Sequence, residues 1–204
     1  MKDGQSHIME KAALLFSQHG AKVTTMDELA LGCGISKRTL YQYFETKEVL
    51  VMAIAQNIVS KNEQHIRIGP GISPNAAAEI ISLFQYIQNQ LEIITPQFVR
   101  DIRKYYPDAY SLFVQFKTNK LVPFVKQNIA RGLREDIYRS DIDIDTTCWL
   151  YTWLLQNAIE ETSVPFEKRF RLVWNTNYLF LYGIMNAKGM KLVYTSIKQG
   201  GYGK

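Results

Sequence analysis

The chain has 204 residues, of which 47% are hydrophobic and 21% are charged, and it carries a formal net charge of +5. These values are typical of an ordinary globular protein with one domain or two small ones, and the positive charge fits an anionic partner. No apolar run approaches the roughly 20 residues that span a bilayer. Because residues 1–4 lead directly into a helical pattern without the apolar core of a signal peptide, we expect a cytoplasmic protein with no membrane partner.

The first helix is predicted over residues 5–19, where apolar side chains recur at helical spacing before a stop at Gly20. A loop follows, and Thr25 then fits a helix N-cap because Glu28, three residues later, completes a capping box. The short helix after this cap should end in a tight turn at Gly34, since glycine turns this sharply without a steric penalty.

A second short helix follows this turn. Ser36 is its N-cap, and Leu40 and Phe44 occupy its inward positions, so the polar and charged side chains between them face solvent. The next helix is expected to extend from Lys47 to about residue 65. A capped helix, a glycine turn and a short helix dense in hydrogen-bonding side chains are together typical of a helix-turn-helix unit that binds duplex DNA.

The same stretch resembles a known family. The run GISKRTLYQYF over residues 34–44, followed by Lys47, Glu48 and Leu50, is similar to the signature of the tetracycline-repressor (TetR) family of bacterial transcription regulators. The resemblance is specific but local, and it extends over residues 8–52, about a quarter of the chain. It implies an all-α protein in which an N-terminal helix-turn-helix domain is joined to a C-terminal helical domain for ligand binding and dimerisation.

The helix after Ser36 presents side chains suited to the major groove, where base edges are read while neighbouring groups hold phosphates. Lys37 and Arg38 suit guanine, Gln42 suits adenine, and Tyr41 also suits a thymine methyl group. Without the family signature, a plain solvated helix face would be the alternative. The predicted DNA-binding residues, whose hydroxyl, ammonium and backbone N–H groups suit base edges or phosphates, are Thr25, Ser36, Lys37, Arg38, Thr39, Tyr41, Gln42, Tyr43 and Lys47.

The distribution of charge constrains how DNA would be held. Residues 1–50 contain six lysines and arginines and six aspartates and glutamates, so the whole positive excess lies outside the predicted DNA-reading unit. Bulk attraction to DNA is therefore not available from this unit. Binding has to depend on where individual charges such as Lys37, Arg38 and Lys47 point.

The remainder of the chain also has helical spacing throughout. Residues 67–75, with two glycines and two prolines, are the clearest breaker, and we place a domain boundary there between residues 1–66 and 75–204. Further helices are predicted at 75–92, 96–104, 107–133, 145–162 and 166–188. Pro123 should kink or break one of them near Val122. The fold class is therefore all-α, with about nine helices.

Aromatic residues are frequent in this second part. At helical spacing they usually form a core, and this remains one interpretation. In the family that the chain resembles, a small ligand binds between the helices of the second domain, moves the DNA-reading heads apart and releases the operator. By that resemblance, a largely apolar ligand pocket would be lined by Tyr110, Phe113, Phe116, Trp149 and Trp153, with Asn157 as the nearest polar group.

The last two predicted helices, 145–162 and 166–188, are rich in apolar residues. The second of them is apolar on more than one face, so it requires cover on more than one side. A single recognition helix reads only a few base pairs, and specific binding normally requires a dimer on a palindromic site. We therefore expect a homodimer through these two helices, as the resemblance also implies; a monomer with an internal last helix is the alternative.

No constellation of residues indicates catalysis. The three histidines are scattered, Cys33 and Cys148 have no metal-binding spacing, and residues 141–145 lack the glycine and closing glutamate of a calcium loop. We expect no enzyme activity, no metal and no cofactor. The predicted function is a transcription regulator, a repressor that a small apolar ligand releases from a palindromic double-stranded DNA operator. The alternative is a DNA-binding architectural or protein-interaction module without such a ligand.

Overall fold

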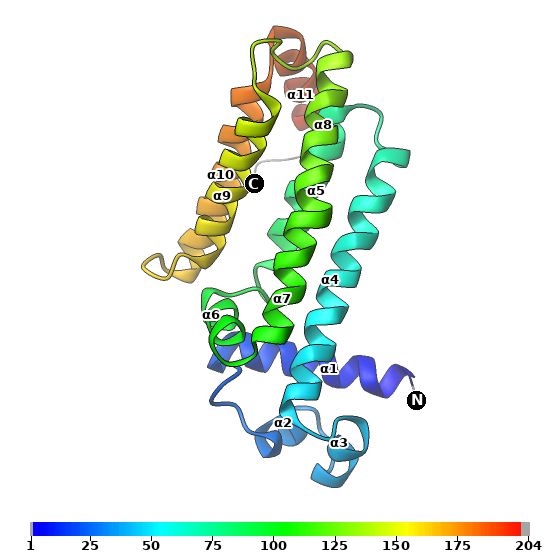
Figure 1. Cartoon of the computed structure of the whole chain (residues 1–204), viewed down its shortest axis with the longest axis vertical. Helices are drawn as coiled ribbons and strands as arrows, with labels where there is room; N and C mark the ends of the chain where they lie inside the picture. Colours follow the sequence, from blue (N-terminus) through cyan, green and yellow to red (C-terminus); the bar gives the residue numbers. More distant parts are fainter. Residues whose placement is uncertain (1, 201–204) are drawn as a thin grey trace. The chain divides into compact units, whose positions relative to one another are not determined.

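A computed structural model describes the backbone of residues 2–200 and the side chains of residues 4–165 and 168–194. Within this range the chain forms α-helices and one π-helical turn but no β-strand, which confirms the all-α fold class (Figure 1). None of the described helices is long and apolar enough to cross a bilayer. The helices are α1 (Lys2–His19), α2 (Met26–Gly32), α3 (Lys37–Tyr43), α4 (Lys47–Ile72), α5 (Ala76–Gln90), α6 (Pro96–Tyr105), α7 (Pro107–Phe116), α8 (Val122–Arg134), α9 (Ile144–Glu160), α10 (Phe166–Ile184) and α11 (Ala187–Gly200).

Helix α4 is longer than predicted, and the expectation that residues 67–75 break the helix is wrong. The helix continues through Pro70 to Ile72, and α5 begins at Ala76. The proline is tolerated because it lies in the last turn, where the loss of one backbone hydrogen bond interrupts no following helix. The change of chain direction is instead confined to residues 73–75.

The predicted break near Val122 is confirmed. The predicted long helix is divided into α7, a π-helical turn at Lys117–Leu121, and α8, which carries Pro123 in its first turn. A proline there is favourable because the first N–H groups of a helix have no intrahelical partner. The predicted helix 166–188 is also divided, since Met185 is extended and separates α10 from α11. The described chain therefore has more helices than the nine expected.

The described chain packs as two compact units, and neither is a single stretch of sequence. The first unit comprises residues up to 63 together with 90–116 and 159–163, and the second comprises residues 64–89, 117–158 and those from 164 onward. These units differ from the predicted domains, 1–66 and 75–204, because α6 and α7 pack in the first unit.

The core of the first unit holds two helices that are too short to persist alone. Both α2 and α3 have seven residues, and an isolated helix of that length is unstable in water. Leu40 of α3 and Phe44 directly after it are almost completely buried. They belong to a hydrophobic cluster that also contains Phe16, Leu29, Leu50, Ile54 and Phe98. The position of α3 therefore depends on this core.

The turn between α2 and α3 is a Schellman motif. Gly34 has a φ of +67°, a left-handed conformation that favours glycine. The Ile35 N–H donates to the Ala30 carbonyl and the Gly34 N–H donates to the Leu31 carbonyl, both at 3.0 Å. Ile35 also packs against the core. Backbone and side-chain contacts together fix the direction in which α3 leaves this turn.

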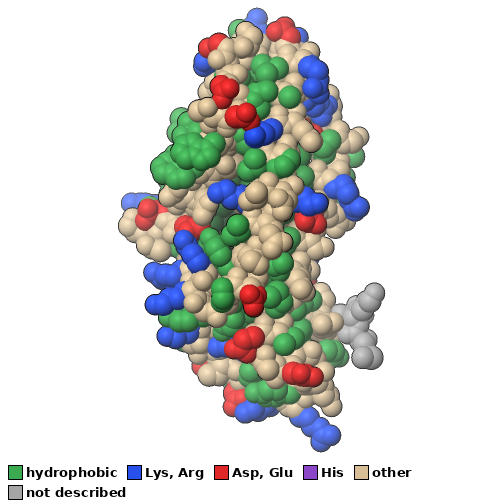
Figure 2. All heavy atoms as spheres, viewed as in Figure 1, with side chains coloured by type: hydrophobic (Ala, Val, Ile, Leu, Met, Phe, Trp, Pro, Cys, Tyr) green, Lys and Arg blue, Asp and Glu red, His purple; other side chains and the backbone are tan. Residues whose placement is uncertain are grey.

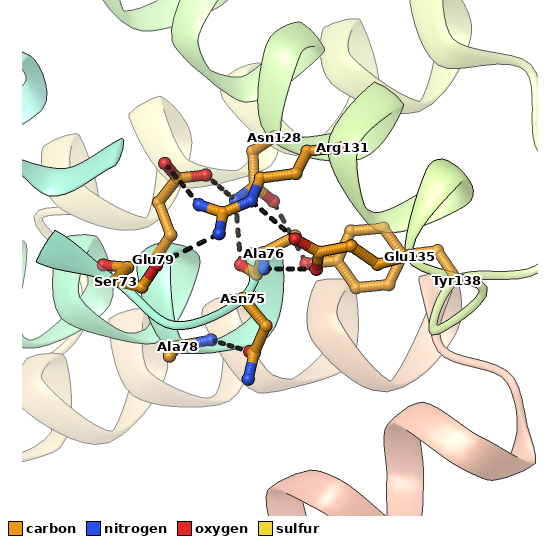
Figure 3. A network of polar contacts seen from close by, with 9 residues as sticks. All are labelled: Ser73, Asn75, Ala76, Ala78, Glu79, Asn128, Arg131, Glu135 and Tyr138. Carbon is orange, nitrogen blue, oxygen red and sulfur yellow. Dashed lines mark hydrogen bonds and ion pairs between the residues drawn. The ribbon is translucent and has the colours of Figure 1, made fainter. Parts of the chain in front are cut away.

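The second unit contains a buried polar network that joins the end of α4, the start of α5 and the helix α8 (Figure 3). Glu79 is almost completely buried, and its carboxylate accepts hydrogen bonds from Asn128 at 2.5 Å and Arg131 at 3.4 Å. Arg131 also donates to the Ser73 carbonyl at 3.0 Å and to Glu135 at 2.6 Å. These partners offset the cost of placing charged groups away from water.

Gly132 provides the space in which the Tyr138 ring packs against α8. The ring is almost completely buried, and its hydroxyl donates to Asn128 at 3.1 Å. A Cβ atom added at Gly132 would lie 2.0 Å from a ring carbon of Tyr138. Any side chain at this position would therefore displace the ring and disturb its hydrogen bond.

Replacing Gly132 with alanine should destabilise the second unit. Overpacking of this kind costs about 1–3 kcal/mol, which urea unfolding would show as a lower midpoint. Gly71→Ala is the matched control, because Gly71 also lies in a helix and an added Cβ atom meets nothing within 4 Å. The control should be neutral or slightly stabilising. A midpoint for G132A equal to that of the unsubstituted protein would contradict this packing.

Candidate nucleic-acid interface

Four side chains project together from α3: Lys37, Arg38, Tyr41 and Gln42 are all exposed. Of these, Arg38 and Gln42 lie on the side of α3 opposite the buried Leu40, which anchors the helix. Lys37 and Tyr41 are one turn apart, as are Arg38 and Gln42, so the four residues form two neighbouring pairs. Ammonium, guanidinium, phenol and amide groups supply the donors and acceptors that contact base edges and phosphates. The structure thus brings four of the predicted DNA-binding residues onto one surface.

Ser36 is confirmed as the N-cap of α3. Its Oγ accepts the Thr39 N–H at 3.0 Å and lies 2.8 Å from the Thr39 Oγ1. Ser36 is exposed and Thr39 is half-buried. Ser36 and Thr39, two of the predicted DNA contacts, therefore stabilise the first turn of α3.

Lys37 and Arg38 differ in how they are held. Lys37 forms an ion pair with Asp27 of α2, with 2.7 Å between the charged atoms, and the hydrogen bond to this carboxylate raises the pKa of Lys37. Both side chains are exposed, so water and salt weaken the pair. Among the residues that the structure describes, Arg38 has no ion-pair partner. Of the two cations, Arg38 is the one directly available to an anion.

Tyr43 does not project with the four exposed residues. It is half-buried and packs against the hydrophobic core. Its hydroxyl lies beside α1, since a Cβ atom added at Gly4 would be 2.7 Å from the Tyr43 oxygen. Tyr43 therefore connects α3 to the first turns of α1.

The predicted capping box at the start of α2 is confirmed. The Thr25 N–H donates to the Glu28 carboxylate at 2.7 Å, and the Glu28 N–H donates to the Thr25 Oγ1 at 3.2 Å. The hydrogen bonds that the carboxylate of Glu28 accepts from the Thr25 N–H and, at 3.0 Å, from the Thr25 hydroxyl hold the pKa of this carboxyl below its usual value. The box keeps a negative charge at this helix end, so it stabilises α2 but does not by itself attract DNA.

Lys47 holds the loop that leads to α2. Its ammonium group donates to the carbonyls of Lys22 at 2.8 Å and Thr24 at 3.1 Å, and the Thr24 hydroxyl donates to the Gly20 carbonyl at 2.8 Å. Two of its three N–H bonds are thus committed, and one remains for an outside acceptor. Sequence reasoning missed this role of Lys47, because its partners are backbone carbonyls that have no sequence signal.

Three predicted ligand-binding residues lie on the outside of α9. Trp149 is 63% exposed and Trp153 is 48% exposed, and the two rings stack with centroids 6.1 Å apart. Asn157 is also exposed and donates to the Trp153 carbonyl at 2.7 Å. In a single copy of the chain these three side chains face solvent, so their place in a ligand pocket stays a prediction. The inward face of α9 is formed instead by Cys148, Tyr151, Thr152, Leu155 and Ala158.

The other three predicted ligand-binding residues belong to α7. Tyr110 and Phe113 are partly buried and pack against the core of the first unit. Phe116 is half-buried at the end of the helix. For Tyr110 and Phe113, this packing favours a role in the hydrophobic core over a role in a ligand pocket.

A cluster of buried aromatic and amide side chains in the second unit was not predicted from the sequence. The Tyr151 hydroxyl donates to Asn177 Oδ1 at 3.0 Å, and its ring stacks on Phe180 with centroids 4.1 Å apart. Phe84 lies against both rings, and burial raises the pKa of Tyr151. Asn177 is fully buried, yet its Nδ2 atom has no hydrogen-bond partner among the described residues, and neither has Oε1 of Gln88. A single amide in an apolar helix has no spacing by which sequence could have found it.

Comparison with known proteins places this geometry in a family. The model for bacterial regulatory proteins of the tetR family matches residues 8–54, which include the whole of α2 and α3. The helix-turn-helix region of this chain is that of the tetR family. No group of three or more His, Cys, Asp and Glu side chains among the chain's described residues could hold a metal ion.

Two transcription regulators are similar to the chain in sequence. The chain is 29% identical over 104 residues to YvaF, an uncharacterized HTH-type transcriptional regulator of Bacillus subtilis, and the match covers 50% of this chain and 54% of YvaF. The chain therefore spans about half the length of that relative. It is 24% identical over 148 residues to the HTH-type transcriptional repressor KstR2 of Mycobacterium tuberculosis, with 69% of this chain and 72% of KstR2 covered. Both are named as transcription regulators rather than enzymes.

Two solved structures of transcription regulators share the fold. The ketosteroid transcriptional regulator KstR2 of Mycobacterium tuberculosis has a TM-score of 0.66 at 18% identity, covering 89% of this chain and 95% of KstR2. A TetR-family regulator from Agrobacterium tumefaciens has a TM-score of 0.73 at 12% identity, covering 91% of this chain and 99% of that one. At these identities the likeness shows the fold alone, a helix-turn-helix region followed by a helical region.

Proposed function

We propose that this TetR-family protein is a cytoplasmic, homodimeric repressor that binds a palindromic double-stranded DNA operator and leaves it when a small, largely apolar ligand binds. The observation that carries the proposal is the surface of α3, where Lys37, Arg38, Tyr41 and Gln42 project from a helix anchored by Leu40. The match of the helix-turn-helix region to the tetR family supports it, as does the naming of KstR2 as a repressor. In this proposal the first unit reads DNA, and the second unit carries the dimer face and the ligand site.

Arg38 and Gln42 are the proposed base readers. They stand one turn apart on the side of α3 farthest from Leu40, so they would reach deepest into the major groove. Arg38 suits guanine and Gln42 suits adenine. Lys37 lies nearer the flank of the helix, and its ion pair with Asp27 has to open before it contacts DNA. We therefore assign Lys37 and Tyr41 mainly to the phosphate backbone.

Arg38→Ala and Gln42→Ala should each weaken binding to an operator that the protein selects from a random DNA pool. The loss of a base contact of this kind lowers affinity about 5- to 100-fold, measured by fluorescence anisotropy at fixed salt. Gln42→Ala should change binding to an unrelated duplex little, because glutamine carries no charge. Lys61→Ala, at an exposed position of α4, is the control and should bind normally. The assignment of α3 fails if no sequence is selected or if both variants bind as well as the unsubstituted protein.

The outer face of α9 and α10 supports the homodimer. Figure 2 shows hydrophobic side chains gathered on this side of the second unit. Large exposed apolar patches on globular proteins are typical of interaction surfaces. A second copy is the occupant that fits best, because two recognition helices on a palindromic site require a two-fold related pair. The exposed apolar residues of this face are Trp149, Leu150, Trp153, Leu154, Leu179 and Tyr182.

Leu179→Glu should convert the dimer to a monomer. Leu179 is 74% exposed in one copy, so the charge leaves the fold intact but has to be buried when two copies meet. Size-exclusion chromatography with light scattering at micromolar concentration would show the change. Val114→Glu, at an exposed apolar position of α7, is the control and should remain dimeric. An unsubstituted protein that is already monomeric under these conditions would refute the proposed dimer.

The proposed ligand site is the buried group around Tyr151 and Asn177. Phe84 and Phe180 supply apolar walls. The Nδ2 atom of Asn177 can donate a hydrogen bond and Oε1 of Gln88 can accept one, and neither has a partner among the described residues. Leaving buried polar atoms unpaired is unfavourable. A mostly apolar molecule with one or two hydrogen-bonding groups fits these atoms and walls.

The double variant Tyr151→Phe with Asn177→Leu should abolish the ligand response. It removes both partners of one buried hydrogen bond and replaces them with apolar groups, a change that is nearly neutral for stability. In a thermal-shift screen of apolar metabolites, compounds that raise the Tm of the unsubstituted protein should leave the Tm of the variant unchanged. The same compounds should release operator DNA only from the unsubstituted protein. A compound that releases DNA equally from both proteins would rule out this site.

A further inference from the structure

Three exposed residues of the first unit form a positively charged cluster outside α3. Lys22, in the loop before α2, donates its ammonium N–H to the Tyr105 hydroxyl at 3.1 Å and lies 4.4 Å from the centroid of that ring. Lys104 lies 5.4 Å from the same centroid. The hydrogen bond from Lys22, together with the nearby charge of Lys104, lowers the pKa of Tyr105. Two cations from separate segments therefore converge on one phenol.

The cluster keeps its positive charge because its acidic neighbour is committed elsewhere. Asp101 is buried, and its two oxygens accept hydrogen bonds from the Lys22 backbone N–H and the Gln97 side chain, both at 3.0 Å. Arg103, on the same helix as Asp101, is paired with Glu160. Among the described residues, no carboxylate forms an ion pair with the ammonium groups of the cluster. Two like charges repel each other, and an anion placed between them relieves this repulsion.

The position of the cluster is fixed relative to the start of α2. The Lys22 backbone is held on both sides, because its N–H donates to Asp101 and its carbonyl accepts from Lys47. Lys22 precedes the N-cap Thr25 by three residues. Thr25 and Lys47 are themselves predicted phosphate contacts, so the cluster extends the same surface from the loop onto the last turn of α6.

We propose that Lys22, Lys104 and Tyr105 form an additional phosphate contact for operator DNA, which makes α6 part of the DNA-binding surface. The inference rests on the proposed function, because it requires that α3 binds a duplex. The ammonium groups supply charge, and the Tyr105 hydroxyl supplies a directed hydrogen bond to a phosphodiester oxygen. DNA is the favoured anion because the cluster adjoins the helix-turn-helix of the same unit, whose first 50 residues have no net charge of their own.

The test is the salt dependence of DNA binding by the double variant Lys22→Gln with Lys104→Gln. A phosphate contact adds affinity to every sequence and contributes roughly 0.9 to the slope of log affinity against log salt concentration. The variant should therefore lose about 5- to 10-fold in affinity per lost contact at 0.1 M salt, equally on the selected operator and on an unrelated duplex. Tyr105→Phe, which keeps the ring and removes the hydroxyl, should cause a smaller loss of the same kind. Lys61→Gln is the matched control for a lysine of the same unit.

The outcomes separate this inference from the proposed function. A reduced slope with equal losses on both duplexes, and an unchanged control, supports the phosphate contact. An unchanged slope and affinity in the double variant overturns it, while operator binding by the unsubstituted protein leaves the proposed function intact. A loss confined to the selected operator also overturns it, because phosphates carry no sequence. Circular dichroism melting should be unchanged in all variants, since the substituted atoms are exposed.

Discussion

The burial of Leu40 and Phe44 is the constraint on which the proposed DNA-reading surface depends. A helix of seven residues has no stability of its own, so α3 exists only because these two side chains enter a core built by α1, α2, α4 and α6. The left-handed turn at Gly34 then sets the direction of the helix. The groups that project from α3 are therefore as well ordered as the core beneath them, which is what a base-reading surface requires.

Several charged side chains of the first unit form contacts within the protein. Lys47 holds the loop before α2, and Asp101 holds the same loop from the other side. Lys37 is engaged with Asp27. Among the described residues near the helix-turn-helix, the cations left without a carboxylate partner include Arg38 in α3 and the cluster of Lys22 with Lys104. In a unit without a net positive charge, the placement of such groups matters more than their number.

The second unit contains two sets of buried polar side chains that differ in whether their atoms have hydrogen-bond partners. Around Glu79 and Arg131, every charged group has hydrogen-bond partners, and the network ties the end of α4 to α5 and α8 (Figure 3). Around Asn177 and Gln88, individual polar atoms have no partner among the described residues. A satisfied network contributes to a defined fold, whereas the unpaired Nδ2 atom of Asn177 belongs to the proposed ligand site. The same unit also carries the exposed tryptophans of α9.

The sequence by itself determined the features whose causes lie within a few residues. The capping box of Thr25, the cap at Ser36, the turn at Gly34 and the break at Pro123 each follow from local hydrogen bonds or sterics, and so do the all-α class and the family signature. Only the tertiary structure decided which face of α9 points outward, that α6 and α7 pack in the first unit, that α4 continues through Pro70, and which groups Lys47 contacts. A helix that is apolar all round has no preferred face until its neighbours are in place, and contacts between distant segments have no periodicity from which they can be read.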